Sequence, residues 1–158
     1  MGLASVLLAK WAGAHVAATV SRPEQERTVR EAGADLVLNR RSDDIPARVR
    51  MATERAGVAR IIDVSLGTNL QADLACLAPN GVVSGYAADS TDAELRVPFM
   101  PEQAHQEAVR DITTALAAGA YRPLIASRSP LDQIAVAHDA QDSGAVVGKI
   151  LLDVAGAG

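Results

Sequence analysis

The chain has 158 residues and a formal net charge of -4, which argues against the basic surface that nucleic-acid binding needs at physiological salt. Its lone cysteine, Cys76, excludes a disulfide framework and a cysteine-rich zinc site within the chain. No apolar run of about 18 residues indicates a membrane span, and we expect a cytoplasmic protein. Hydrophobic residues make up 49% of the chain and aromatic residues 3%, a composition that suits helices alternating with parallel strands.

The first predicted element is a helix in which Leu3, Val6, Leu7 and Leu8, with Trp11 beyond, place apolar side chains on one face, and Gly13 ends it. Residues 15–20 predict a short buried strand. Residues 21–24 form the polar turn at its carboxyl end, where open α/β sheets bind their ligands. This order is typical of the second half of a dinucleotide-binding βαβ unit.

A strand and a glycine turn normally precede such a unit and let a pyrophosphate reach the helix N-terminus. Met1 therefore reads as a start placed inside a domain. Gly2 reads as the last glycine of the fingerprint, whose amide would approach the pyrophosphate; the alternative is that Gly2 only begins the helix.

The rest of the chain alternates helix and strand patterns. Helices are predicted over 24–32, 43–55, 70–77, 102–118 and 131–142, and strands over 36–38, 60–64, 82–86 and 146–154, with 122–125 extended. Such alternation with short connections is typical of a parallel sheet covered on both faces. We therefore predict an α/β fold and a single dinucleotide-binding domain over residues 1–158: a Rossmann-like, doubly wound parallel sheet, truncated by the absence of its first strand and glycine loop.

Five segments together resemble a known family. They are GLASVLLAKWAGAHVAATVS, EAGADLVLN, IIDVSLGTN, LAPNGVVSGYA and SGAVVGKILLDV, in that order. This order resembles the nucleotide-binding half of the medium-chain dehydrogenase/reductases, closest to the NADPH:quinone oxidoreductase branch. The resemblance implies an NADPH-dependent oxidoreductase that transfers hydride to a quinone or an α,β-unsaturated carbonyl. We expect this part alone to be inactive.

The sequence departs from the family in two places. The family's N-terminal barrel-like domain, which holds most substrate contacts and, in the alcohol dehydrogenase branch, the zinc ligands, has no counterpart here. The passage from Pro98 to Glu102 is short, which predicts an internal deletion near residue 100 and puts in doubt the edge-strand homodimer that the resemblance implies. Segments within 120–158 would contact the absent catalytic domain. The alternatives are a stand-alone nucleotide-sensing or structural module and part of a zinc-dependent alcohol dehydrogenase.

The predicted cofactor residues begin with Ser21 and Arg22, which stand where an acidic residue would bind the ribose 2′-hydroxyl of NAD. A hydroxyl and a guanidinium suit a 2′-phosphate instead, so NADPH is expected and NADH less so. The alternative is a solvated loop. Arg40 falls where relatives often have a tyrosine beside the adenosine phosphate, and it either supplies a second charge or is a surface arginine.

Two further turns follow the predicted strands over 60–64 and 82–86. Ser65, Gly67, Gly85 and Tyr86 lie in these turns, which in similar enzymes line the ribose and nicotinamide. Glycine permits close approach of backbone to a ligand, but any tight turn needs it equally. Asp63 is expected to be structural and to accept hydrogen bonds from backbone amides near its strand end.

The remaining candidates carry no predicted chemistry. Cys76 is expected in the core, and His15, His105 and His138 are expected to be solvated, because their spacing is not that of metal ligands. No residue is assigned to catalysis or to a metal.

Overall fold

The computed structural model describes residues 2–86, 101–144 and 146–154. The elements are α1 (Gly2–Trp11), β1 (Ala17–Val20), α2 (Pro23–Glu31), β2 (Leu36–Asn39), α3 (Ile45–Ala52), β3 (Val58–Asp63), α4 (Leu66–Cys76), β4 (Leu77–Gly85), α5 (Glu102–Ala117), β5 (Ile125–Pro130), the 3-10 turn η1 (Leu131–Gln133), α6 (Ile134–Asp142) and β6 (Lys149–Asp153). The chain divides into two compact units, Met1–Ala120 and Tyr121–Gly158.

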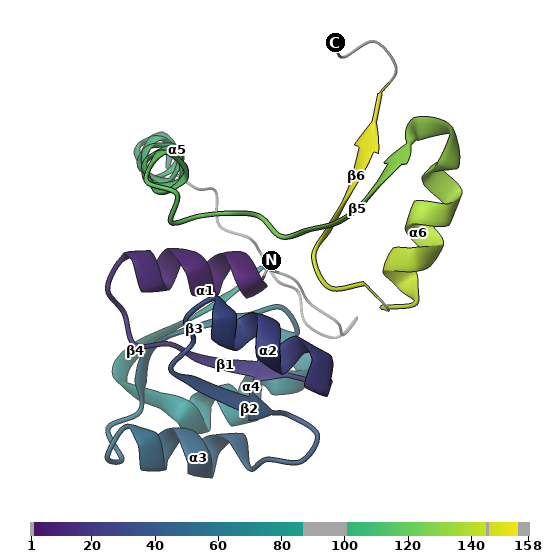
Figure 1. Cartoon of the computed structure of the whole chain (residues 1–158). Helices are drawn as coiled ribbons and strands as arrows, with labels where there is room; N and C mark the ends of the chain where they lie inside the picture. The colour runs from purple at the N-terminus through teal and green to yellow at the C-terminus, as the bar shows by residue number, and fades with distance from the viewer. Residues whose placement is uncertain (1, 87–100, 145, 155–158) are drawn as a thin grey trace. The chain divides into compact units, whose positions relative to one another are not determined.

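All described strand pairs are parallel. In the first unit β1 pairs with β2, and β3 pairs with β4. Figure 1 shows α1 and α2 above these strands and α3 and α4 below them. Parallel strands joined by helices on both faces are the arrangement of a doubly wound sheet, so the predicted Rossmann-like α/β fold is confirmed.

The helix boundaries follow from local chemistry. Gly13 and Gly33 adopt φ values of 82° and 96° directly after α1 and α2, a backbone conformation that ends a helix and suits glycine. Pro23 opens α2, because its fixed φ suits the first helical turn. Asp44 caps α3, where its carboxylate oxygen Oδ1 accepts the Ala47 N–H at 3.0 Å.

The structure corrects several predicted boundaries, among them that of β5, which covers Ile125–Pro130 whereas residues 122–125 were predicted to be extended. Strand β4 begins at Leu77 rather than residue 82, because Leu77 pairs with Val58 ahead of a register shift in the ladder. Helix α4 begins at Leu66 rather than residue 70. Strand β6 begins at Lys149 rather than residue 146, because Gly148 has a φ of 126° and lies against the backbone of β5, outside strand conformation.

The core of the first unit lies between β2, β3 and the two helices below them. Leu38, Val49 and Cys76 are buried and pack against partly buried residues, namely Leu36, Ile45, Val58 and Ile61. The prediction that Cys76 is a core residue is confirmed. Burial raises the pKa of its thiol, and the charge of Asp73 adds to the effect, so the thiol is held protonated.

The second unit contains β5 and β6 as a parallel pair, with α6 packed on both strands. Ala137 of α6 is buried, and Arg128 donates to Asp153 at 3.2 Å across the pair. The proposed deletion near residue 100 falls on positions outside the described ranges, so it stays a prediction. Among the helices described, none is long and apolar enough to cross a membrane.

Candidate functional site

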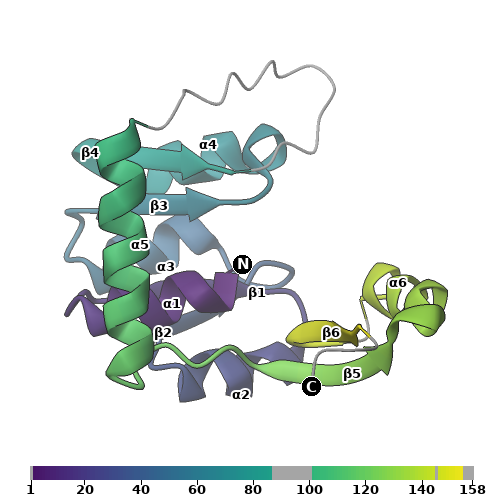
Figure 2. The ribbon, with the colours of Figure 1, turned by 90° about the horizontal axis from the view of Figure 1, so that it is seen from above.

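The register of β1 and β2 brings three predicted residues to one edge. Val20 lies opposite Asn39, so Ser21 and Arg40 follow at the same level. The Arg40 N–H donates to the Val20 carbonyl at 2.9 Å and joins the two turns. Figure 2 shows that the N-terminal end of α1, which begins at Gly2, lies on the same side as the carboxyl ends of β3 and β4. We call the residues 21–22 and 40–41 the β1–β2 edge.

The turn from β1 to α2 is held by one side chain. The Gln25 amide oxygen Oε1 accepts the Ser21 N–H at 2.9 Å and the Arg22 N–H at 3.1 Å. Arg22 precedes α2 in an extended conformation, with φ -138° and ψ 144°. The backbone on either side of Arg22 is therefore fixed, and only its side chain is left to interact with a ligand.

The turn from β2 to α3 is held in a similar way by Asn39 and Asp43. The Asp43 oxygen Oδ2 accepts the Asn39 N–H at 2.7 Å, and the Asn39 oxygen Oδ1 accepts the Arg41 N–H at 3.0 Å. Asp43 also lies 4.0 Å from Arg48. The Asp43 carboxylate is therefore engaged by Asn39 and Arg48, and it forms no ion pair with Arg40 or Arg41.

The guanidinium groups of the β1–β2 edge have no ion-pair partner within the part of the chain that the structure describes. Arg40 and Arg41 are exposed, and Arg22 is half-buried. Glu26, on the neighbouring helix, is paired with Arg30 at 2.7 Å. Unpaired guanidinium groups with planar forks of donors suit a phosphate better than a neutral hydroxyl.

A second group of predicted residues lies at the ends of β3 and β4. Asp63 lies opposite Gly85, and the Tyr86 N–H donates to the Asp63 carbonyl at 3.1 Å. The Asp63 carboxylate accepts the Ser65 N–H at 2.5 Å and the Asn69 side-chain amide at 2.8 Å. The predicted structural role of Asp63 is confirmed, since it fixes the turn into α4.

The predicted glycines have different environments. Gly67 lies within the first turn of α4 rather than in an open turn. A Cβ at Gly85 would lie 3.0 Å from the Leu66 side chain, so close packing by itself requires a small residue there. Gly2 is the first residue of α1, is exposed, and has open space around it. Ligand contact at these glycines stays a prediction.

Sequence reasoning missed two residues, Gln25 and Asp73. A glutamine at the third position of a helix is a signal for a bond back to the preceding turn, which could have identified Gln25. Asp73, on α4, has a buried Oδ2 that finds no hydrogen-bond partner among the residues that the structure describes. Burial raises its pKa to about 6, with a further contribution from the charge of Asp63. In the sequence, the sign of a partly buried acid here is that Asp73 stands among the apolar residues Ala72, Leu74 and Ala75.

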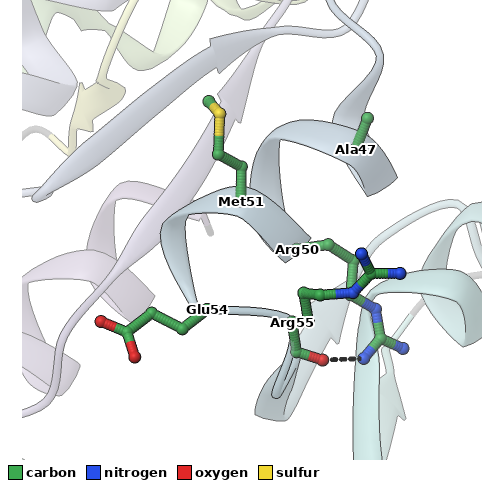
Figure 3. A pocket seen from close by; sticks show the side chains of 5 residues that line it. All are labelled: Ala47, Arg50, Met51, Glu54 and Arg55. Atoms are coloured by element: carbon green, nitrogen blue, oxygen red, sulfur yellow. Dashed lines mark hydrogen bonds between the residues drawn. The ribbon is translucent and has the colours of Figure 1, made fainter.

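The other candidate features lie elsewhere. Among the described residues no group of three or more His, Cys, Asp or Glu side chains could hold a metal ion, so these residues do not fit a zinc site. His15, His105 and His138 are exposed, as predicted. An open pocket of about 690 Å³ lies at the end of α3, on residues that include Arg50 and Met51 (Figure 3). The Arg50 guanidinium there is already bonded to the carbonyls of Ala75, Arg55 and Leu77.

The chain is similar to known oxidoreductases in sequence and in structure. Quinone oxidoreductase from Lama guanicoe is 25% identical over 96% of this chain and 51% of its own length. The 2-haloacrylate reductase of Burkholderia sp is 28% identical over 96% of this chain and 52% of its own length. A mycobacterial protein solved in complex with NADPH is 26% identical, with a TM-score of 0.75 over 96% of this chain and 52% of that chain.

The chain thus spans about half the length of the curated relatives it matches. The family model described as zinc-binding dehydrogenase matches residues 1–130. Together with the parallel, doubly wound strands, this match shows that the chain belongs to the zinc-binding dehydrogenase family, as a nucleotide-binding domain of the medium-chain dehydrogenase/reductase type.

Proposed function

We propose that this chain is the cofactor-binding part of an NADPH-dependent oxidoreductase that transfers hydride to a quinone or an α,β-unsaturated carbonyl. The names of the relatives and the NADPH complex of the mycobacterial protein support this class of reaction. The observation that carries the choice of NADPH is the convergence of Ser21, Arg22 and Arg40 at the ends of two paired strands.

The residues of the β1–β2 edge fit the 2′-phosphate of NADPH. Ser21 offers a hydroxyl, and Arg22 and Arg40 offer guanidinium donors without ion-pair partners among the described residues. No acidic residue stands on the two strand ends to accept a hydrogen bond from a free 2′-hydroxyl. Ser65, Gly67, Gly85 and Tyr86 would lie toward the ribose and nicotinamide, and Gly2 toward the pyrophosphate. When bound, the cofactor supplies the hydride.

The test is titration of the purified chain with NADPH and with NADH, followed by calorimetry. We expect NADPH to bind more tightly, and Arg22→Ala to weaken NADPH binding by about tenfold, since a hydrogen bond to a charged group contributes about 1.5–3 kcal/mol. NADH binding should change little. The matched control is Arg110→Ala, which removes an exposed arginine from α5.

Equal binding of the two nucleotides, unchanged by Arg22→Ala, would remove the phosphate assignment. A small-molecule quinone or carbonyl substrate, a homodimer and a cytoplasmic location belong to the same proposal for the whole protein. The substrate class rests on the names of the relatives, whereas the homodimer and the cytoplasmic location rest on the sequence analysis alone.

A further inference from the structure

We propose that the free edges of β1 and β3 form an acceptor site for an extended apolar segment of another polypeptide, which enters as a parallel strand between them. The sequence analysis predicts that one strand of the sheet is missing, and the structure shows which two edges are left without a neighbour. The acceptor site is the flank of the two strands and not the turns proposed to bind the nucleotide, so this inference does not depend on the proposed function.

Hydrogen bonds at the two ends of β1 show which of its residues face away from β2. The carbonyls of Val16 and Val20 accept N–H groups from the β2 side of the ladder at 3.2 and 2.9 Å. In a parallel strand the N–H and C=O groups of one residue point to the same side, and successive residues alternate. Ala17 and Thr19 therefore direct their N–H and C=O groups away from β2.

The same alternation applies to β3. The Asp63 carbonyl accepts the Tyr86 N–H at 3.1 Å, so Asp63 faces β4, and the backbone groups of Arg60 and Ile62 point to the other side. No strand that the structure describes pairs with β1 or with β3 on these outward sides. Two rows of backbone donors and acceptors are therefore open to an added strand.

The two edges belong to one packed unit and run in the same direction. Leu38 of β2, Val49 of α3 and Cys76 of α4 form one buried cluster, and Ile61 of β3 packs against it, so the two strand pairs share a core. Figure 2 shows β1 and β3 as the inner strands of the two pairs. Helix α1 begins on the side of the carboxyl ends of β3 and β4, and β1 returns to that side after a short turn.

Side chains along these edges are more exposed than is usual in a doubly wound sheet. Ile62 is 56% exposed, Val64 directly after β3 is 50% exposed, and Ala17 and Thr19 are also exposed. Parallel strands covered by helices normally bury such residues. An added strand between the edges would cover them. It should be apolar on both faces and about five residues long, to match the four residues of β1 and the six of β3.

The open groups indicate what kind of partner fits. Two rows of alternating N–H and C=O groups match the main chain of an extended segment, whereas a small molecule could not pair with both rows. Every strand that the structure describes already lies in a pair, so a second copy of this chain would have to break a pair to supply one. The occupant to which the proposal commits is therefore a strand-forming apolar segment of a different polypeptide.

The probe is the synthetic peptide acetyl-Lys-Val-Ile-Val-Thr-Val-Lys-amide, and its control is the same peptide with N-methyl groups on every second residue. Binding to the full chain is followed by hydrogen exchange detected by NMR. We expect the probe to slow exchange of the Ala17, Thr19, Arg60 and Ile62 amides by about tenfold or more, because these groups gain hydrogen bonds. The Ala18 amide, which faces β2, should change little. The N-methylated peptide cannot bond to both edges and should give no protection.

A spin label on the carboxyl end of the probe tests its direction. A parallel strand should bring the label to the carboxyl ends of β1 and β3 and broaden the resonances of Ser21 and Val64. The resonances of Val16 and Gly57, at the amino ends of the same strands, should stay sharp. Broadening of the second pair instead would overturn the parallel orientation.

Thr19→Pro removes one N–H from the free edge and leaves the pairing with β2, because proline is tolerated where the N–H of a strand is unpaired. We expect it to weaken binding of the probe by about tenfold. The matched control is Val83→Pro, since Tyr86 faces β3 and the alternation directs the Val83 N–H to the outer side of β4. Thermal melts report whether both variants fold, and the N-methylated peptide keeps the test decisive if Thr19→Pro does not.

The outcomes separate this inference from the proposed function. Absence of protection by the probe, or equal protection by the N-methylated peptide, would overturn the acceptor site. Protection of the same amides without peptide that rises with the concentration of the chain would also overturn it, since a second copy would then occupy the edges. The readout contains no nucleotide, so failure of NADPH binding leaves the acceptor site standing, and failure of the acceptor site leaves the NADPH titration to be judged by itself.

Discussion

Asp73 lies on α4 with one carboxylate oxygen buried and unpartnered, and with Asp63 as a nearby negative charge. Both effects disfavour the ionised form, which is why its pKa is raised to about 6. Because the folded-state pKa lies above the unfolded value of 3.8, the folded chain holds this proton over a pH range in which the unfolded chain has lost it.

The proton held by Asp73 makes the stability of the folded chain depend on pH. The free energy of unfolding should fall as the pH rises from about 4 to about 6, and the full destabilisation should be present above that range. We expect Asp73→Asn to stabilise the chain near pH 7 by about 1 kcal/mol, a value reduced for partial solvent screening, and to change it little near pH 4. Urea unfolding at both pH values measures this.

Asp111→Asn, on the exposed face of α5, is the control for loss of a carboxylate. Equal stabilisation by Asp73→Asn at both pH values would contradict this explanation.

The ionisation of Asp35 affects stability at lower pH than that of Asp73, and its contribution to the free energy of unfolding rises with pH. The hydrogen bond from Lys10, with that of the Val16 amide, lowers the pKa of Asp35, so its contribution is lost only as the pH falls below about 4.

At the scale of elements, the turn between α3 and β3 packs against the junction of α4 and β4. Gly57 has a φ of 83°, and its N–H donates to the Thr53 hydroxyl at 3.0 Å. A Cβ there would lie 2.7 Å from the Cys76 carbonyl oxygen and 2.8 Å from the Ala78 nitrogen. Glycine is needed at this position for its conformation and for the close approach of the backbone.

Gly13 offers a matched comparison, because its φ is 82° but nothing lies within 4 Å of the position that a Cβ would occupy there. Gly13→Ala should cost only the left-handed conformation, about 1–2 kcal/mol. Gly57→Ala should cost at least about 1 kcal/mol more, because the surrounding backbone has to shift. Denaturant unfolding of both variants measures the difference, and equal losses would show that the junction yields without strain.

At the scale of the whole molecule, the role proposed for the described strand ends is to bind and orient a nucleotide. Hydride transfer also needs an acceptor held against the nicotinamide. The relatives are about twice as long as the region that they share with this chain. We propose that residues outside this shared region help to hold the hydride acceptor.

We therefore expect the purified chain to bind nucleotide but not to oxidise NADPH in the presence of a quinone. The measurement is the absorbance of reduced nicotinamide over time, with a full-length quinone oxidoreductase as the positive control. A rate comparable to that of the control would show that the chain is a complete catalyst and would overturn this expectation.

Much of this fold was open to prediction from local patterns. The first helix with its stop before Gly13, the strand predicted at 36–38 and the glycines that end α1 and α2 depend on periodicity and on backbone preferences that neighbours in the chain determine. Ser21 and Arg40 were both predicted as cofactor residues, Arg40 through the family resemblance, and the pairing of β1 with β2 brings them to one edge.

The sequence by itself determined the order of elements and the parallel class of the sheet, because these follow from short-range patterns and from the alternation of helices with strands. Only the tertiary structure decided that one carboxylate oxygen of Asp73 is buried without a hydrogen-bond partner among the described residues, that Gly57 touches the backbone beyond α4 and that β4 begins at Leu77. These features depend on which distant segments meet, and packing and strand register decide that rather than any residue's own preference.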